Sequence, residues 1–262
     1  MIGLFRLAWG YIIYWFSSVG RHGLQSTFLY NLNESVWRYD KKKLSQKRIE
    51  SYRKRCLKDK IAVAVNDFGA GVNGNLKKEL SIASIAKNAA KHPKYARMLF
   101  RLMEYLKPNT VIELGTSLGI SSLYISSGNP KMKLTTLEGC DAIAEFSRKQ
   151  FQQFPDLNIE VITGNFDTTL SELLKSQSKI DSIYIDGNHR YEPTMRYFTL
   201  CLPYMHDESF IIFDDINWSK EMKSAWQEII KHPSVSVSID VYMMGIVFFN
   251  KGFSKQDFKI RY

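Results

Sequence analysis

Cysteine is scarce in this chain of 262 residues, which contains only Cys56, Cys140 and Cys201. An odd number of widely separated cysteines does not form a disulfide framework, and their spacing matches no metal-binding motif. We therefore expect reduced thiols in a cytoplasmic protein, and a core that is held together by packing rather than by cross-links.

A long uninterrupted apolar run is also missing. Residues 2–19 are rich in apolar and aromatic side chains, but Arg6 interrupts them, and the part before Ser17 is shorter than the ~20 residues of a membrane-spanning helix. The stretch also lacks the basic start and the small-residue cleavage site of a secretory signal. We expect a helix with one apolar stripe, made of Leu4, Leu7, Ala8, Tyr11, Ile12, Trp15 and Phe16.

Acidic residues are sparse near the N-terminus. Residues 1–60 hold 13 Lys and Arg against 4 Asp and Glu, whereas the other 202 residues hold 23 against 22. Because the basic character belongs to this arm alone, we expect no sequence-specific nucleic-acid binding by the whole protein. Two interpretations of the arm stay open: it docks on the rest of the chain or on a second copy, or it lies on an anionic membrane surface.

The rest of the chain follows an α/β pattern. From residue 108 to 262, short apolar runs alternate with helical ones, which is typical of a Rossmann-like doubly wound sheet. We predict seven strands, mostly parallel, with a C-terminal antiparallel hairpin formed by residues 235–241 and 246–250. Residues 1–60 would then be a helical arm, and residues 61–107 a lid segment with two lead-in helices.

Residues 110–122, with the sequence TVIELGTSLGISS, contain the main binding signal. A β-branched run, a turn with two glycines and a helix start bring free backbone amides close to a ligand. The spacing E-x-G-x-x-x-G differs from the dinucleotide pattern, and the carboxylate of Glu113 favours a cationic ligand over a pyrophosphate. The next strand ends at Glu138, at a distance that suits a ribose-binding carboxylate. Residues 61–71 resemble this pattern without a following helix, and we interpret Asp67–Gly71 as a flap or a surface loop.

At these residues the chain resembles the class I S-adenosylmethionine-dependent methyltransferases. The segment ELGTSLGISS is most similar to the small-molecule O-methyltransferase branch that includes catechol O-methyltransferase. The resemblance covers roughly residue 91 to the end and implies S-adenosylmethionine as methyl donor. It assigns the glycine loop to the methionine part of the donor, Glu138 to the ribose and the turn 165–167 to the adenine. The predicted donor-binding residues are Glu113, Gly115, Thr116, Ser117, Gly119, Ser121, Glu138, Gly139, Asn165, Phe166, Asp167 and Asp186.

The same resemblance implies an acceptor site beside the last parallel strands. Asp186 matches the first ligand of the family's divalent cation, and Asp214 and Asp215 match its acidic-amide pair, with Asp in place of Asn. Mg²⁺ is the type of cation that three carboxylates would hold. His189 stands where the family has a catalytic lysine, and three roles stay open for it: general base, metal ligand or structural residue at a helix start. We predict His189 and Asp186 as catalytic residues.

The acceptor class follows from two missing motifs. The segment 185–189 has no proline, which an adenine methylase would show there, and the chain has no Pro-Cys pair for a cytosine carbon methylase. We therefore predict O-methylation of a small-molecule acceptor. Two alternatives remain: an NAD-dependent oxidoreductase, although residues 120–122 lack its third glycine, and a donor-binding scaffold or membrane-binding protein without turnover.

Overall fold

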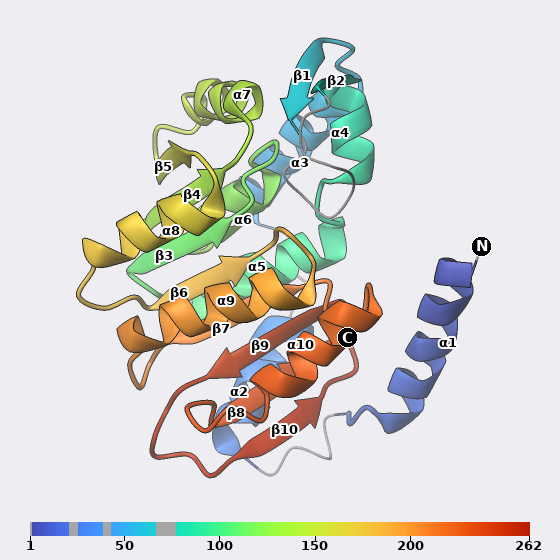
Figure 1. The fold of residues 1–262 in the computed structure, drawn as a ribbon, viewed down its shortest axis with the longest axis vertical. Helices are drawn as coiled ribbons and strands as arrows, with labels where there is room; N and C mark the ends of the chain where they lie inside the picture. Colours follow the sequence, from blue (N-terminus) through green and yellow to red (C-terminus); the bar gives the residue numbers. More distant parts are fainter. Residues whose placement is uncertain (1, 21–25, 39–42, 67–76) are drawn as a thin grey trace. The chain divides into compact units, whose positions relative to one another are not determined.

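The computed structural model describes residues 2–20, 26–38, 43–66 and 77–262 (Figure 1). These residues form two compact units. Unit 1 combines Met1–Asn31 with Leu173–Tyr262, and unit 2 is Leu32–Glu172. The predicted arm, residues 1–60, is therefore divided between the two units, and the predicted flap Asp67–Gly71 lies outside the described residues.

Three parallel strands organise unit 2, namely β3 (Thr110–Leu114), β4 (Lys133–Glu138) and β5 (Asn158–Thr163), in the order β3-β4-β5. Helix α6 (Ile120–Gly128) follows β3 and helix α7 (Asp141–Phe151) follows β4. The last four residues of β3 are all buried, as expected for a strand covered on both faces. The parallel order brings the carboxyl ends of all three strands to one edge of the sheet, where we expected the donor site.

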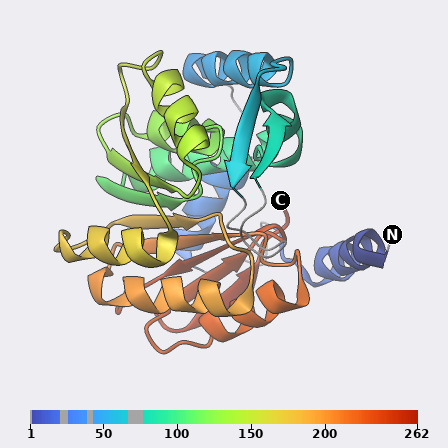
Figure 2. The same ribbon diagram turned by 45° about the horizontal axis from the view of Figure 1, so that its top comes forward.

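The N-terminal part of unit 2 adds helices and a small antiparallel pair (Figure 2). Ser81 ends β2 and caps α4, since its side chain accepts a hydrogen bond from the Ser84 amide at 3.2 Å. The two predicted lead-in helices begin at Ile82 and at Pro93, and proline is favoured at a first helical position. The elements are η2 (Asn33–Arg38), α3 (Leu44–Cys56), β1 (Ala62–Asn66), β2 (Lys77–Ser81), α4 (Ile82–Asn88) and α5 (Pro93–Leu106).

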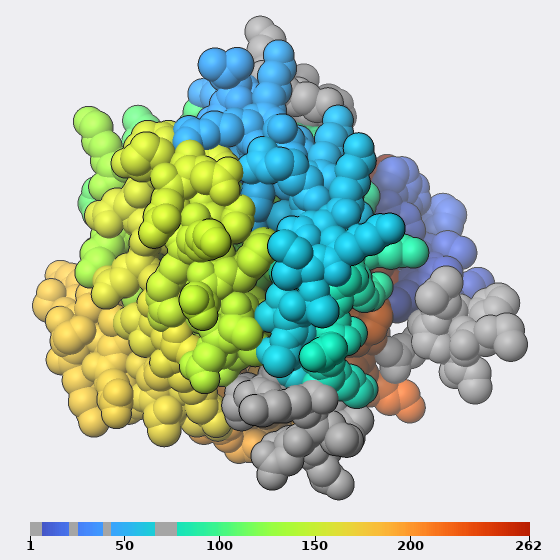
Figure 3. All heavy atoms as spheres, turned by 90° about the horizontal axis from the view of Figure 1, so that it is seen from above, coloured from blue at the N-terminus to red at the C-terminus, as the bar shows by residue number. Residues whose placement is uncertain are grey.

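Helix α3, which belongs to the basic residues 1–60, is part of the core of unit 2. Ile49, Tyr52 and Cys56 are spaced to share one helical face and are almost completely buried in a cluster with residues of α6 and α7. On the outer side, Arg48 pairs with Asp156 at 2.8 Å, so α3 and the segment after α7 lie on one surface (Figure 3).

Unit 1 contains the remaining strands, in the order β6-β7-β9-β8-β10. Strand β9 runs antiparallel to β7 and β8, and this confirms the predicted antiparallel hairpin. Helices α9 and α10 follow β6 and β7, while α8 joins the two units. The elements are α1 (Ile2–Ser17), α2 (Thr27–Leu32), α8 (Phe166–Lys175), β6 (Ser182–Ile185), α9 (Tyr191–Cys201), η3 (Leu202–Tyr204), β7 (Phe210–Asp214), α10 (Lys220–Ile229), β8 (Val237–Asp240), β9 (Met244–Phe248) and β10 (Gln256–Lys259).

The predicted count of seven main strands was one too low. Within the described residues, three such strands belong to unit 2 and five to unit 1. The missed strand is β10, which pairs in parallel with β8. Its sequence Gln-Asp-Phe-Lys has little apolar character, because it is an edge strand with alternate residues exposed.

The N-terminal helix α1 forms as predicted, but the predicted stripe does not describe its packing. Phe16 is 83% exposed and Ile12 46% exposed, whereas Tyr14, which lay outside the predicted stripe, is buried. Among the described helices, none is long and apolar enough to cross a lipid bilayer.

Candidate functional site

The loop between β3 and α6 has an unusual backbone. Gly115, Ser117 and Gly119 have φ angles of 104°, 47° and 74°, in the region that favours glycine. A Cβ on Gly119 would also lie 2.4 Å from a ring atom of Phe151. Glycine is therefore favoured at this position for two reasons: the φ angle is positive, and the Phe151 ring of α7 leaves no space for a Cβ atom. The first amides of α6, which have no intrahelical acceptor, remain available beside this loop.

Glu113 lies beneath this loop. Its side chain is fully buried and accepts hydrogen bonds from the hydroxyls of Ser122, in α6, and Thr136, in β4, the latter at 2.7 Å. The Thr136 hydroxyl also meets that of Thr116 at 2.7 Å. From this position Glu113 orders the loop from below, and its contact with the donor stays a prediction. Sequence reasoning missed the hydroxyl partners, since the β3–β4 register that brings them together is not visible in a single chain segment.

Glu138 connects the two loops that follow β3 and β4. Its carboxylate accepts one hydrogen bond from the Ser117 amide at 2.8 Å and another from the Cys140 amide at 3.0 Å. Burial raises the pKa of Glu138, and the amides of Cys140, Ser117 and Gly139 partly oppose this shift. A carboxylate has about four acceptor sites. The acceptor sites that these amides do not use remain for a ligand in the position where a ribose was predicted.

The turn after β5 leads directly into α8. The helix starts at Phe166, because the Asn165 side chain caps it by accepting a hydrogen bond from the Asp167 amide at 2.9 Å. Asp167 is exposed in the first helical turn. Its predicted contact with an adenine stays a prediction, as does any donor contact of Ser121, which is 7% exposed in α6.

Two side chains from other helices hold the carbonyls of the glycine loop. The Tyr52 hydroxyl, in α3, donates to the Leu118 carbonyl at 2.7 Å, and the Ser147 hydroxyl, in α7, donates to the Ser117 carbonyl at 2.5 Å. Sequence reasoning missed both. The sequence feature that could have indicated Tyr52 is its helical spacing with Ile49 and Cys56, which predicts a buried face. The many Lys and Arg residues around it made this face hard to recognise.

Replacement of Tyr52 by Phe is expected to lower the free energy of unfolding by about 1–3 kcal/mol, because the buried Leu118 carbonyl loses its donor. The measurement is a denaturant titration of the full chain. Tyr191→Phe is the matched control, since its hydroxyl contacts Glu228 at the surface. Equal stability of the two variants would refute the role of Tyr52.

The turn after β6 pairs two of the predicted catalytic residues. The His189 Nε2 atom lies 3.6 Å from Oδ1 of Asp186, whose other oxygen accepts a hydrogen bond from the Tyr184 hydroxyl at 2.9 Å. Both side chains of the pair are partly exposed. Tyr184 thus orients Asp186, and Asp186 lies where it can orient the imidazole and stabilise its charged form.

The residues after β7 do not complete a metal site. Asp214 is the last residue of β7 and is 1% exposed, and Asp215 follows with a φ of 53°. Throughout the described part of the chain, no group of three or more His, Cys, Asp or Glu side chains is placed to hold a metal ion. The predicted cation at Asp186, Asp214 and Asp215 therefore has no ligand set in this structure.

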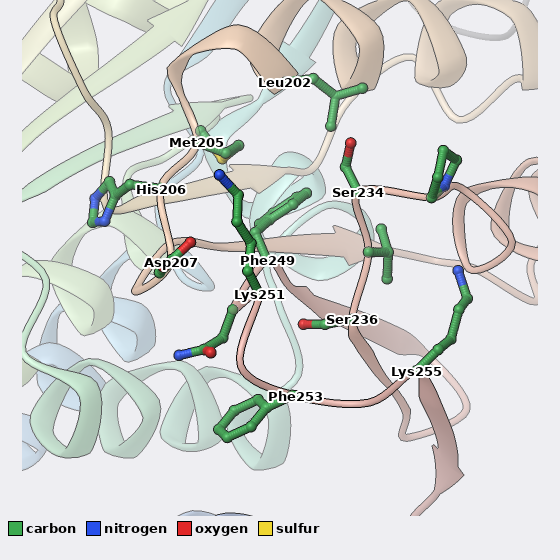
Figure 4. A pocket seen from close by; sticks show the side chains of 13 residues that line it. Leu202, Met205, His206, Asp207, Ser234, Ser236, Phe249, Lys251, Phe253 and Lys255 are labelled. Atoms are coloured by element: carbon green, nitrogen blue, oxygen red, sulfur yellow. The ribbon is translucent and has the colours of Figure 1, made fainter.

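A surface depression of about 690 Å³ lies elsewhere in unit 1 (Figure 4). Its wall includes His206 and Asp207, which precede β7, and Ser236, which precedes β8. It therefore lies at the amino ends of these strands, whereas Asp186 and Asp214 lie at the carboxyl ends of β6 and β7. Ligands of parallel α/β sheets bind at the carboxyl ends, so the depression is not the predicted acceptor site.

A family model described as a methyltransferase domain matches residues 112–216. This part of the chain is therefore similar to a methyltransferase domain. The matched range includes every predicted donor-binding, catalytic and metal-binding residue, from Glu113 to Asp215.

Solved structures show that the similarity in fold extends beyond the matched range. An O-methyltransferase from Bacillus cereus, in complex with SAH, is 16% identical with a TM-score of 0.55, over 85% of this chain and 97% of that one. The O-methyltransferase TomG from Streptomyces achromogenes, in complex with SAM, is 12% identical with a TM-score of 0.56, over 80% and 91%. These similarities confirm the predicted Rossmann-like fold of class I methyltransferases.

A curated relative comes from Acanthamoeba polyphaga mimivirus, where it is an uncharacterized protein. It is 26% identical over 133 residues, which are 46% of this chain. The aligned part spans 59% of that relative's length.

Proposed function

We propose that this protein transfers a methyl group from S-adenosylmethionine to a hydroxyl oxygen of a small-molecule acceptor. The observation that carries the proposal is the carboxylate of Glu138, which two backbone amides hold against the glycine loop. The methyltransferase domain match and the fold shared with SAM- and SAH-bound O-methyltransferases support the same donor.

Unit 2 supplies the donor site in this proposal. The unoccupied acceptor positions of Glu138 take the paired ribose hydroxyls, and the loop from Gly115 to Gly119 lies against the methionine part. Asn165, Phe166 and Asp167 flank the adenine. Bound S-adenosylmethionine supplies a methyl group on a positively charged sulfur, so that the acceptor oxygen attacks the carbon while the carbon–sulfur electron pair leaves with the sulfur.

His189 is the base in this proposal. His189, in its neutral form, accepts the proton of the acceptor hydroxyl, and Asp186 stabilises the imidazolium that results. Tyr184 fixes the orientation of Asp186. The proposal includes no step through a cation, since the described carboxylates provide no metal-binding group.

The donor is tested by thermal unfolding of the full chain with S-adenosylmethionine, S-adenosylhomocysteine or NAD. A ligand at one hundred times its Kd stabilises by about 2.7 kcal/mol, so both sulfur compounds should raise Tm and NAD should not. Stabilisation by NAD alone would favour the oxidoreductase alternative. Methyl transfer to a panel of phenols, sugars and lipids then distinguishes the enzyme from a donor-binding scaffold, which would show donor binding and no product.

A further inference from the structure

The N-terminal helix α1 has one face packed against the C-terminal part of unit 1. The Tyr242 hydroxyl donates to the Leu7 carbonyl, and the Tyr14 hydroxyl donates to the Ile260 carbonyl. Gly10 lets Tyr242 approach, because a Cβ there would lie 3.0 Å from its hydroxyl. The rings of Tyr11 and Tyr242 meet edge to face with their centroids 5.1 Å apart. Contacts from Leu7 to Tyr14 thus fix the helix along its length.

The opposite face of α1 is apolar and exposed. Trp9, Ile12, Ile13 and Phe16 are 66%, 46%, 55% and 83% exposed. Their spacing of three, four and seven residues places them on one stripe. Single exposed apolar residues are ordinary on protein surfaces, whereas a continuous stripe marks an interaction site. The helix is therefore apolar on both sides, with only one side covered.

Exposed cationic side chains lie at the end of α1, next to this stripe. At the end of α1, Val19 pairs with Ile260, which lies between the exposed Lys259 and Arg261. The Arg261 guanidinium lies 4.4 Å from the centre of the Trp15 ring and donates to the Trp15 carbonyl at 2.9 Å. Cationic side chains thus flank an aromatic-rich apolar face.

We propose that this face of α1 binds the surface of an anionic lipid bilayer. With 16 residues, the helix is about 24 Å long, and its packed inner face keeps it parallel to such a surface. The outward side chains would enter the boundary between headgroups and acyl chains, where Trp is favoured, and the cations would face lipid phosphates. This proposal does not depend on the proposed methyl transfer.

A second copy of the chain fits the stripe less well. A stripe about 24 Å long and about 10 Å wide offers roughly 250 Å² per copy, whereas a stable interface needs about 800 Å² from each partner. Two such faces would also bring cations of equal sign together. A bilayer has neither limitation, because its contact area is not restricted and its phosphates are negative.

The test is flotation of the full chain with vesicles of three parts phosphatidylcholine to one part phosphatidylglycerol, and with vesicles of phosphatidylcholine alone. We expect binding to the mixed vesicles that weakens at least tenfold without the anionic lipid. The double variant W9S/F16S should bind the mixed vesicles at least tenfold more weakly than the original chain. Because both side chains are exposed, its Tm should remain within a few degrees of the original.

Leu44→Ser is the matched control, since Leu44 is 81% exposed on α3 and lies outside the stripe. This variant should float like the unchanged chain. The proposal is overturned if the unchanged chain does not float, or if W9S/F16S floats equally well. It is also overturned if sedimentation shows a concentration-dependent dimer that W9S/F16S abolishes.

Discussion

Replacement of His189 by Ala is expected to lower kcat for methyl transfer by about 100-fold or more, since a positioned general base contributes about 10²–10⁴. The affinity for S-adenosylmethionine should not change. The proposed donor contacts, made by Glu138, the glycine loop and the turn 165–167, belong to unit 2, whereas His189 belongs to unit 1. Steady-state kinetics with an accepted hydroxyl compound give kcat, and calorimetric titration of the donor gives the affinity.

His206→Ala provides a matched control for this loss. His206 forms a comparable pair with Asp181 at 2.8 Å, but it precedes β7 and lies at the opposite edge of the sheet from Asp186. Its replacement should leave kcat within about twofold. The base assignment fails if His189→Ala retains the original kcat.

The order of strands and helices was largely predictable because continuous apolar runs end in glycine or acidic residues. Strands β3 and β4 and the antiparallel strands β8 and β9 lie close to their predicted positions. The missed strands β2 and β10 are short and polar, and only pairing with a neighbouring strand makes them strands.

The candidate site was predictable in its backbone and less so in its side-chain roles. Gly119 was recognisable from the sequence, because a glycine is favoured where the φ angle is positive and where the Phe151 ring leaves no space for a Cβ atom. Glu113 gives no such signal, because an acidic residue at a strand end suits both a ligand contact and a buried hydrogen-bond acceptor. The β3–β4 register places Glu113 opposite Thr136 and so explains its hydrogen bond to that residue, but this register cannot be read from one segment of the sequence. Tyr52 was missed for a related reason: contacts from a distant helix leave no local pattern.

Glu138→Gln is expected to change donor affinity and stability in opposite directions. The neutral amide cannot offer the charged acceptors that the ribose hydroxyls would use, and hydrogen bonds to charged groups contribute about 1.5–3 kcal/mol. Donor affinity should therefore fall by about 10- to 100-fold. Calorimetric titration with S-adenosylhomocysteine measures this loss without turnover.

The stability of the unliganded protein should increase in the same variant at neutral pH. Burial raises the pKa of Glu138, so the folded state binds a proton more tightly than the unfolded state, and the charged carboxylate destabilises the fold at neutral pH. This penalty disappears as the pH falls through the raised pKa. The advantage of Glu138→Gln in Tm should consequently be present at neutral pH and shrink in acid.

Glu160→Gln is the control for both measurements, because Glu160 lies on β5 in an exposed pair with Lys133 at 2.9 Å. Such a surface pair contributes little to stability, and the residue lies outside the donor site. Unchanged donor affinity in Glu138→Gln would refute the ribose assignment. If Glu138→Gln loses stability at neutral pH and keeps its donor affinity, as Glu160→Gln should, the hydrogen bonds to the backbone amides are the whole function of Glu138. The two measurements together therefore separate a carboxylate that is kept for a ligand from one that only joins two loops.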